Sequence, residues 1–112
     1  MRIAIPLADG RLSQHFGHCE CFAMVDVDLK AKKILKREDI DAPPHQPGLL
    51  PPWLAEQGAD VIIAGGMGHR AQGLFAEQGI QVVVGVSADP PEKLVGAYLQ
   101  GTLDAGENLC DH

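Results

Sequence analysis

Apolar residues in this chain occur in short runs, and the pattern between the runs changes near residue 50. Before that point the runs are separated by turn-forming residues, which is typical of strands. Beyond it, buried runs rich in valine and isoleucine alternate with longer segments of helical spacing. The predicted elements are strands at residues 2–7, 20–27, 33–38, 61–64 and 82–84, and helices at residues 51–57, 69–78 and 90–101.

A short internal repeat supports the second half of this assignment. Residues 54–63 align with residues 75–84, and each copy contains a helix end, a glycine and a buried strand. Gly58 and Gly79 occupy the position where helices commonly end in a left-handed residue. Continuous apolar strands between helices indicate parallel strands covered on both faces. We therefore predict a three-layer α/β domain with a mixed five-stranded sheet, in the order β-β-β-α-β-α-β-α, whose second strand is antiparallel.

The length of 112 residues indicates one domain, which we assign to residues 1–101, followed by a tail at residues 102–112 that carries Cys110 and His112. The N-terminal apolar run is too short for a signal peptide, and no run approaches the roughly 18 residues of a membrane span. We expect a cytoplasmic protein with no membrane partner. Three cysteines argue against a closed disulfide framework, and a reducing compartment leaves such thiols available for metal.

The formal net charge of −6 does not favour a nucleic-acid partner. Most of the nine basic residues lie in one stretch, Lys30, Lys32, Lys33, Lys36 and Arg37. A solvated hairpin whose edge is protected by lysines is the favoured interpretation, and a binding patch is the alternative.

Histidine and cysteine residues cluster at residues 15–21 and at residues 110–112. Such side chains bind zinc, copper(I) and iron–sulfur species. One further histidine, His69, follows a run of glycines, and His45 lies in a proline-rich loop where we expect it to be solvated. Cys21 alternates with Ala23 and Val25 and is predicted to be a core residue, whereas Cys19 is the better ligand candidate. The candidate metal ligands are His15, His18, Cys19, His69, Cys110 and His112.

Glycines at positions 65, 66 and 68 follow the predicted strand 61–64 and precede a helix. Backbone N–H groups in such a turn attract anions, and Arg70 adds a positive charge. The spacing also fits a dinucleotide fingerprint, but no clear acidic ribose ligand follows about 20 residues on. A tight turn that needs glycine and an anion or cluster site remain equally open. Strands 2–7 and 61–64 should be parallel neighbours, so the loop that holds His15 and His18 can face the glycine loop across one cleft.

Three segments together resemble the dinitrogenase iron–molybdenum cofactor biosynthesis family. They are the strand Ile3-Ala4-Ile5, the motif Ser13-x-His15-Phe16-Gly17 leading into Phe22-x-Met24-Val25-Asp26, and the run from Asp60 to Gly68. The resemblance covers nearly the whole chain. It implies a ribonuclease H-like fold and a ligand site between the His15 loop and the Gly65–Gly68 loop. It also implies a role in carrying a nitrogenase-type cofactor, its precursor or another metal–sulfur cluster.

The leading hypothesis is a non-catalytic carrier of an anionic iron- or molybdenum-containing metal–sulfur cluster, which exchanges its cargo with donor and acceptor proteins. His15, His18, His69 and Cys19 would be direct ligands of the cluster. Three glycines would donate N–H groups to its sulfides, namely Gly65, Gly66 and Gly68, and Arg70 would neutralise its charge. Cys110 and His112 would close over the cluster.

Other functions stay open at this point. They are a simple zinc- or copper-binding protein that uses Cys19, Cys110 and His112, and a nucleotide-binding module built on the glycine turn. A nuclease is disfavoured because Asp9 and Asp26 are the only early carboxylates that could hold magnesium, and no matching set lies near the later strands. A homodimer is compatible with the sequence but is not required by it.

Overall fold

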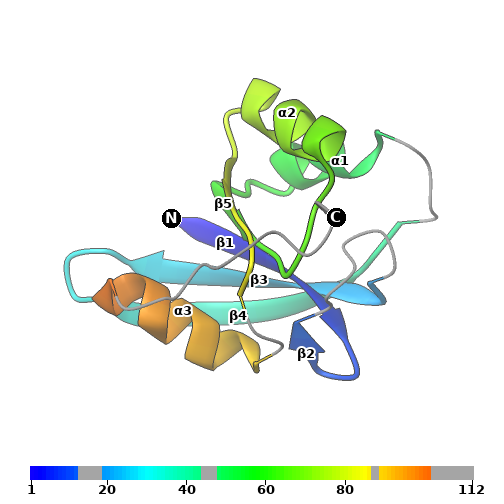
Figure 1. The fold of residues 1–112 in the computed structure, drawn as a ribbon. Coiled ribbons are helices and arrows are strands. Elements are labelled where there is room, and N and C mark those ends of the chain that lie inside the picture. The colour runs from blue at the N-terminus through cyan, green and yellow to red at the C-terminus, as the bar shows by residue number, and fades with distance from the viewer. Residues whose placement is uncertain (13–18, 44–47, 87–88, 102–112) are drawn as a thin grey trace.

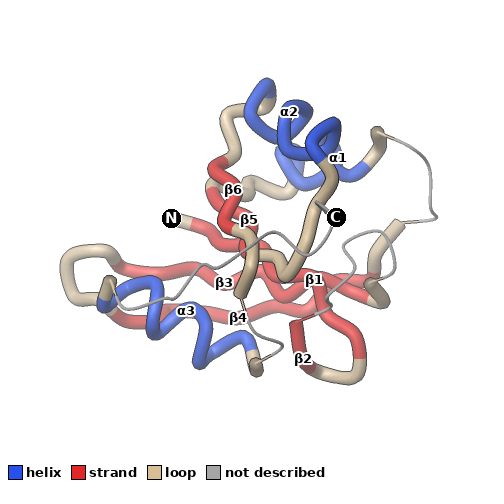
Figure 2. The backbone as a smooth tube through the Cα atoms, viewed as in Figure 1, coloured by secondary structure: helices blue, strands red, loops and turns tan. Residues whose placement is uncertain are grey.

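A computed structural model describes residues 1–12, 19–43, 48–86 and 89–101 of the chain. Figures 1 and 2 show a mixed α/β arrangement in which a curved sheet lies between helices. The strands are β1 (Arg2–Ala8), β2 (Arg11–Leu12), β3 (Cys21–Asp28), β4 (Lys33–Asp41), β5 (Val61–Ile63) and β6 (Gln81–Val83), and the helices are α1 (Leu50–Glu56), α2 (His69–Glu77) and α3 (Pro91–Gln100). In the part of the chain that is described, no helix is long and apolar enough to cross a membrane.

The five strands other than β2 lie in the order β4-β3-β1-β5-β6. Strand β1 is antiparallel to β3 and parallel to β5, with Ile3 opposite Val61, and β5 is parallel to β6. This confirms the predicted mixed sheet with an antiparallel second strand. It also confirms that the first strand and the strand after α1 are parallel neighbours, which brings their carboxyl ends to the same edge of the sheet.

The prediction of five strands was wrong by one, because β2 pairs with the end of β1. Asp9 and Gly10 connect the two strands with φ angles of 55° and 78°. Positive φ at both central residues is the geometry of a tight hairpin turn, and Asp-Gly is a sequence that favours it. The sequence therefore contained the signal for β2 in a segment that we had expected to be a loop.

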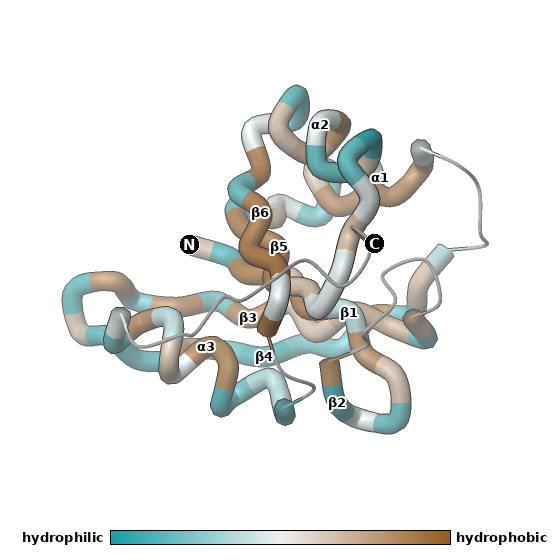
Figure 3. The backbone as a smooth tube through the Cα atoms, viewed as in Figure 1, coloured by the Kyte–Doolittle hydropathy of each residue, from teal (hydrophilic) through white to brown (hydrophobic). Residues whose placement is uncertain are grey.

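Hydrophobic side chains form one cluster on each face of the sheet, which gives the predicted three layers. Figure 1 shows α3 on one face and α1 with α2 on the other, and Figure 3 shows hydrophobic residues along β5 and β6 and hydrophilic residues along β4. The α3 side includes Ile3, Ile5, Leu7, Val25, Ile63, Leu94 and Val95. The side of α1 and α2 includes Ala4, Phe22, Leu54, Ile62, Met67 and Phe75.

The internal repeat is visible in the structure. Leu54 and Phe75 are both fully buried, and the carbonyl oxygen of each accepts a hydrogen bond from the N–H five residues on, at 3.1 and 3.0 Å. Gly58 and Gly79 have φ angles of 83° and 76°, as predicted for left-handed helix ends. Each copy therefore makes the same turn from a helix into a parallel strand.

The ends of the predicted elements agree with the structure to within one residue, except at the end of β4. Strand β4 continues to Asp41 rather than residue 38, because β3 pairs along its whole length and sets Cys21 opposite Asp41. Helix α3 begins at Pro91 with Pro90 at the capping position and no side-chain cap. The carboxylate of the preceding residue, Asp89, lies 3.6 Å from Lys93 Nζ.

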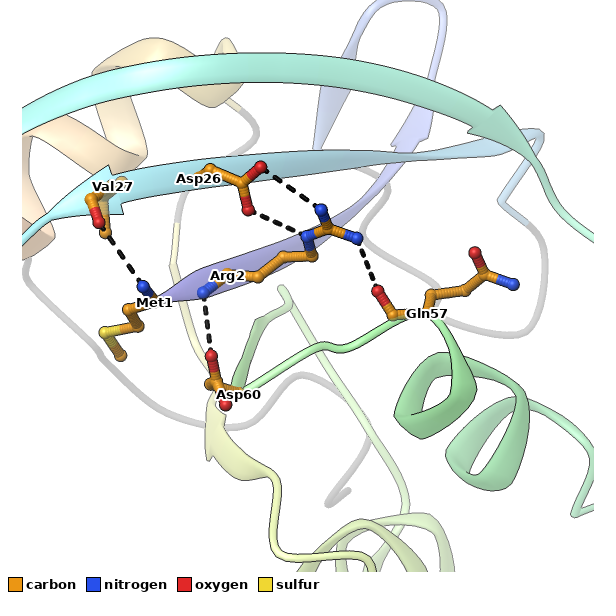
Figure 4. A network of polar contacts seen from close by, with 6 residues as sticks. All are labelled: Met1, Arg2, Asp26, Val27, Gln57 and Asp60. Carbon is orange, nitrogen blue, oxygen red and sulfur yellow. Dashed lines mark hydrogen bonds and ion pairs between the residues drawn. The ribbon is translucent and has the colours of Figure 1, made fainter.

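A polar network joins the amino end of β1 to β3 and to the end of α1 (Figure 4). Arg2 donates to both carboxylate oxygens of Asp26, from Nε at 2.8 Å and from Nη2 at 3.3 Å, and its Nη1 donates to the carbonyl oxygen of Gln57 at 2.6 Å. The backbone N–H of Arg2 donates to Asp60 at 2.9 Å. The hydrogen bond from Arg2 holds the pKa of Asp26 below its ordinary value. The polar groups of Arg2 at this end of the sheet are thus bonded to other groups of the protein itself.

Candidate functional site

The carboxyl ends of β1 and β5 lie at one edge of the sheet, where α/β folds commonly bind ligands. The chain after β5 forms a loop at residues 64–68 that leads into α2. The backbone N–H of Ala64 donates to Val83 at 2.8 Å, and the N–H of Gly85 donates to the Gly65 carbonyl at 3.0 Å. The start of the loop is therefore fixed against the segment that follows β6.

The buried part of this loop contains N–H groups for which the described residues provide no acceptor. Gly65, Gly66 and Met67 are buried, yet within the described residues no acceptor is found for the N–H of Gly65 or of Gly66. Buried N–H groups are almost always paired in folded proteins, because an unpaired donor loses its hydrogen bonds to water. These two amides are consequently suited to a ligand that accepts hydrogen bonds.

Gly68 is exposed and has no internal reason to be glycine. Its φ of −65° is available to any residue, and a Cβ at this position would meet nothing within 4 Å. This disfavours the interpretation that the glycine at 68 serves a tight turn. The absence of a side chain leaves the backbone open to a close approach from outside.

Helix α2 begins directly after the loop. Its first turn contains His69 and Arg70, which are both exposed, and no side chain caps the helix. The first amides of a helix have no acceptor within it, and the helix dipole makes this end favourable for negative charge. The loop and α2 together therefore present backbone donors, one imidazole and one guanidinium.

Cys19 lies at the same edge, just before β3. The N–H of Glu20 donates to the carbonyl of Leu7 near the end of β1 at 2.8 Å, and the Cys19 side chain packs against the cluster that contains Met67. Burial is the main reason why the pKa of Cys19 is raised to about 11. The thiol is therefore protonated at neutral pH, and binding to a metal would release its proton.

Cys21 does not join Cys19 at this site. Cys21 is half-buried and packs against the cluster on the α3 side, together with Ala23 and Val25. Burial, followed by the charge of Asp39, raises the pKa of Cys21. Because the two thiols pack on opposite faces of the sheet, they do not form a chelating pair. The expectation that Cys21 packs with the core is confirmed.

Several predicted ligands lie outside the described residues, namely His15, His18, Cys110 and His112, and so does His45. The segment with His15 and His18 is attached at both ends to the candidate edge, because Leu12 pairs with Leu7 and Glu20 bonds to Leu7. Within the described part of the chain, no group of three histidine, cysteine or acidic residues could hold a metal ion.

Met67 lies within the glycine loop and was not among the predicted site residues. This residue is buried between the glycines and packs in the same cluster as Cys19. The nearby side chain of Gln72 donates to the Met67 carbonyl at 2.9 Å and fixes the loop from the α2 side. A methionine placed within a run of glycines was the available signal, because a thioether is a soft ligand that tolerates irregular packing.

Comparison with known proteins identifies the family. The model of the family described as dinitrogenase iron-molybdenum cofactor matches residues 1–101. The chain belongs to this family. The resemblance seen in the sequence is thereby confirmed, and the family ties the chain to an iron–molybdenum cofactor and to metal clusters in general.

Two solved structures and one relative are similar to this chain over almost their full length. The crystal structure of PH0822 matches with a TM-score of 0.88 and 29% identity over 100% of both chains. The apo form of the orange protein from Desulfovibrio gigas matches with a TM-score of 0.73 and 26% identity over 96% of this chain and 93% of that one. An uncharacterized protein of Methanocaldococcus jannaschii is 29% identical over 96% of this chain and 92% of its own length.

Proposed function

We propose that this protein is a non-catalytic, cytoplasmic carrier of an anionic metal–sulfur cluster that contains iron or molybdenum, or of a precursor of such a cluster. The observation that carries the proposal is the pair of buried amides at Gly65 and Gly66, which have no acceptor among the described residues. Sulfides of an anionic cluster accept hydrogen bonds and would complete this edge of the sheet.

The donor set suits a cargo that is released again. A structural zinc site has four fixed side-chain ligands, whereas the described edge offers Cys19, His69 and backbone N–H groups. In the proposal, His15 and His18 add ligands from the preceding loop, Arg70 neutralises cluster charge, and Cys110 with His112 closes over the cargo. Few and exchangeable ligands favour transfer to an acceptor protein.

Family membership and one structural relative support the same function. The orange protein from Desulfovibrio gigas was solved in a form described as apo. For this chain we propose donor and acceptor proteins of a cluster as partners, with no nucleic acid and no membrane, and a homodimer remains compatible. The ribonuclease H-like label for the fold belongs to the same proposal.

Anaerobic loading tests the proposal. The chain without a histidine tag is incubated with iron, sulfide and molybdate under reducing conditions, desalted, and analysed for metal and acid-labile sulfide together with its visible absorption. We expect bound sulfide and metal in the parent and a loss of at least about 10-fold in the His15→Ala, His69→Ala double variant, because each lost ligand weakens binding by a factor of about 10 or more. The His45→Ala variant is the matched control and should load like the parent.

Two results contradict the proposal. One is equal loading of the double variant and the parent, which would place the cargo elsewhere. The other is one zinc ion per chain with no sulfide after purification and loading, which would identify a simple zinc protein.

A further inference from the structure

The end of the β3–β4 hairpin exposes large apolar side chains. We define the hairpin end as Met1 together with residues 28–36. Leu29 is 56% exposed, Leu35 is 60% exposed and Met1 is 37% exposed, and within the described residues these are the exposed large hydrophobic side chains. The amino group of Met1 donates to the carbonyl of Val27 at 3.4 Å, which places Met1 beside the hairpin. Figure 1 shows the turn between β3 and β4 at the left of the molecule, and the contact with Val27 places Met1 beside β3 close to this turn.

The same end carries cations that the protein leaves unpaired. Residues 28–36 have a net charge of +3, in a chain whose formal net charge is −6. The lysines of the hairpin end form no ion pair in the part of the chain that the structure describes; they are Lys30, Lys32, Lys33 and Lys36. In contrast, Arg37 pairs with Asp39 and Glu92, and Lys93 lies near Asp89.

The backbone of the hairpin end is irregular at two residues: Lys32 has a left-handed conformation that is unfavourable for lysine, and Leu35 lies in a bulge. Asp28 Oδ1 accepts hydrogen bonds from the N–H groups of Lys30 and Ala31, at 2.9 and 3.1 Å, and the turn ends with Lys32 at a φ of 53°. Glycine or asparagine would fit that left-handed position better. The register also shifts: Ile34 is opposite Val27 and Lys36 is opposite Asp26, so Leu35 occupies a bulge.

Edge protection explains only part of this arrangement. β4 is the outermost strand of the sheet, and lysines and a bulge discourage pairing with other sheets. Two exposed leucines have the opposite effect, because they favour association. Apolar side chains surrounded by charges of one sign are typical of a docking surface with charge complementarity.

We propose that the hairpin end docks a partner protein whose surface offers an apolar side chain among carboxylates. Nucleic acid and anionic membranes fit less well, because the rest of the chain is strongly acidic and the hairpin end contains no arginine and no aromatic residue. The hairpin end and the glycine loop lie at opposite ends of β1, about 20 Å apart for a strand of this length. A docked partner would therefore leave the candidate ligand site open.

An NMR titration of the full-length, isotope-labelled chain tests this proposal. The probe is a short synthetic peptide of glutamates with two central leucines, and a second peptide replaces both leucines with serine. We expect amide shifts confined to residues 28–36 and their strand neighbours, at least about 10-fold weaker binding of the serine peptide, and weaker binding at high salt.

Variants separate the contributions of the two kinds of side chain. Lys30→Gln with Lys33→Gln and Lys36→Gln, and separately Leu29→Ser with Leu35→Ser, should each weaken binding at least about 10-fold. Lys93→Gln, an exposed lysine on α3, should bind like the parent. Three results overturn the proposal: shifts centred elsewhere, stronger binding to anionic lipid vesicles or to single-stranded DNA than to the leucine peptide, and self-association of the chain that the leucine variant abolishes.

Discussion

The two ends of β1 differ in how their polar groups are satisfied. At the amino end, Arg2 uses its guanidinium and its backbone N–H to bind Asp26, Gln57 and Asp60 (Figure 4). At the carboxyl end, the buried amides of Gly65 and Gly66 have no acceptor within the described residues. The first end needs nothing from outside the protein, whereas the second is suited to a ligand.

The amino and carboxyl ends of β1 also differ in the charge of the groups that surround them. One ion pair from Arg2 to Asp26 and one hydrogen bond from Arg2 to the Gln57 carbonyl hold β1, β3 and the end of α1 together, so the amino end contributes to stability. The carboxyl end offers a protonated thiol at Cys19 and the backbone N–H groups of Gly65 and Gly66. Soft sulfur and N–H donors with few fixed charges favour a bulky anionic cargo over a small, hard cation. Four variants or titrations sharpen this comparison.

The largest expected effect is on the reactivity of Cys19. A pKa of about 11, compared with an ordinary value of 9.0, reduces the thiolate fraction about 100-fold near neutral pH. In a variant with Cys21→Ser and Cys110→Ser, the rate of alkylation by iodoacetamide should rise with a midpoint near pH 11. In urea the midpoint should return to the ordinary value. A midpoint at or below 9 in the folded protein would show that the thiol is not in an apolar environment.

Removal of the arginine at the other end should destabilise the fold. Arg2→Ala deletes both hydrogen bonds to Asp26 and the bond to the Gln57 carbonyl, and we expect a loss of about 2 kcal/mol in the free energy of unfolding by urea. Arg11→Ala, at an exposed arginine on the short strand β2, should change stability by less than about 0.5 kcal/mol. Equal effects of the two variants would remove the contrast between the ends.

Gly68→Ala should separate binding from stability. A Cβ here meets no atom of the protein, so the free energy of unfolding should stay within about 0.5 kcal/mol of the parent. The same Cβ would obstruct a ligand that approaches the backbone, and affinity for a loaded cluster should fall about 10-fold. Unchanged affinity, measured by anaerobic equilibrium dialysis, would argue against contact between the ligand and residue 68.

The smallest effect is the pH dependence of the amino end. Because Arg2 lowers the pKa of Asp26 below 3.8, the stability from this pair is fully present above that pH and is lost as the pH falls through the folded pKa. The difference in unfolding free energy between the parent and Asp26→Asn should therefore be about 1 kcal/mol at pH 7 and should shrink below pH 4. A difference that grows on acidification would contradict this assignment.

The sequence predicted the parts of the fold that depend on local patterns. The parallel pairing of β1 with β5 followed from continuous apolar runs, and the helix ends at Gly58 and Gly79 followed from glycine chemistry. Features that depend on distant parts of the chain were not predictable. The backbone bends at Glu20, which breaks the alternation that would have placed Cys19 and Cys21 on one face.

The N–H groups of Gly65 and Gly66, which have no acceptor among the described residues, are another feature that depends on distant parts of the chain. A run of glycines indicates that a backbone can approach a ligand, but it does not say which N–H groups are already used. That depends on the segment at β6: the Val83 carbonyl accepts from the N–H of Ala64, and Gly85 donates to the Gly65 carbonyl. Among the described residues, the N–H groups of Gly65 and Gly66 find no acceptor. The sequence therefore predicted a candidate site at this edge, and the structure shows which N–H groups there have no acceptor among the described residues.

The most direct test of the central claim is an amide NMR titration of the labelled chain with tetrathiomolybdate, an anionic molybdenum–sulfur complex, under anaerobic conditions. The account predicts that the largest shifts occur at Gly65, Gly66 and Cys19, while Arg2 and the lysines of the hairpin end stay unchanged. Shifts that centre on the lysine-rich hairpin, with none at the two glycines, would mean that the anion follows surface charge and that the buried amides do not bind it.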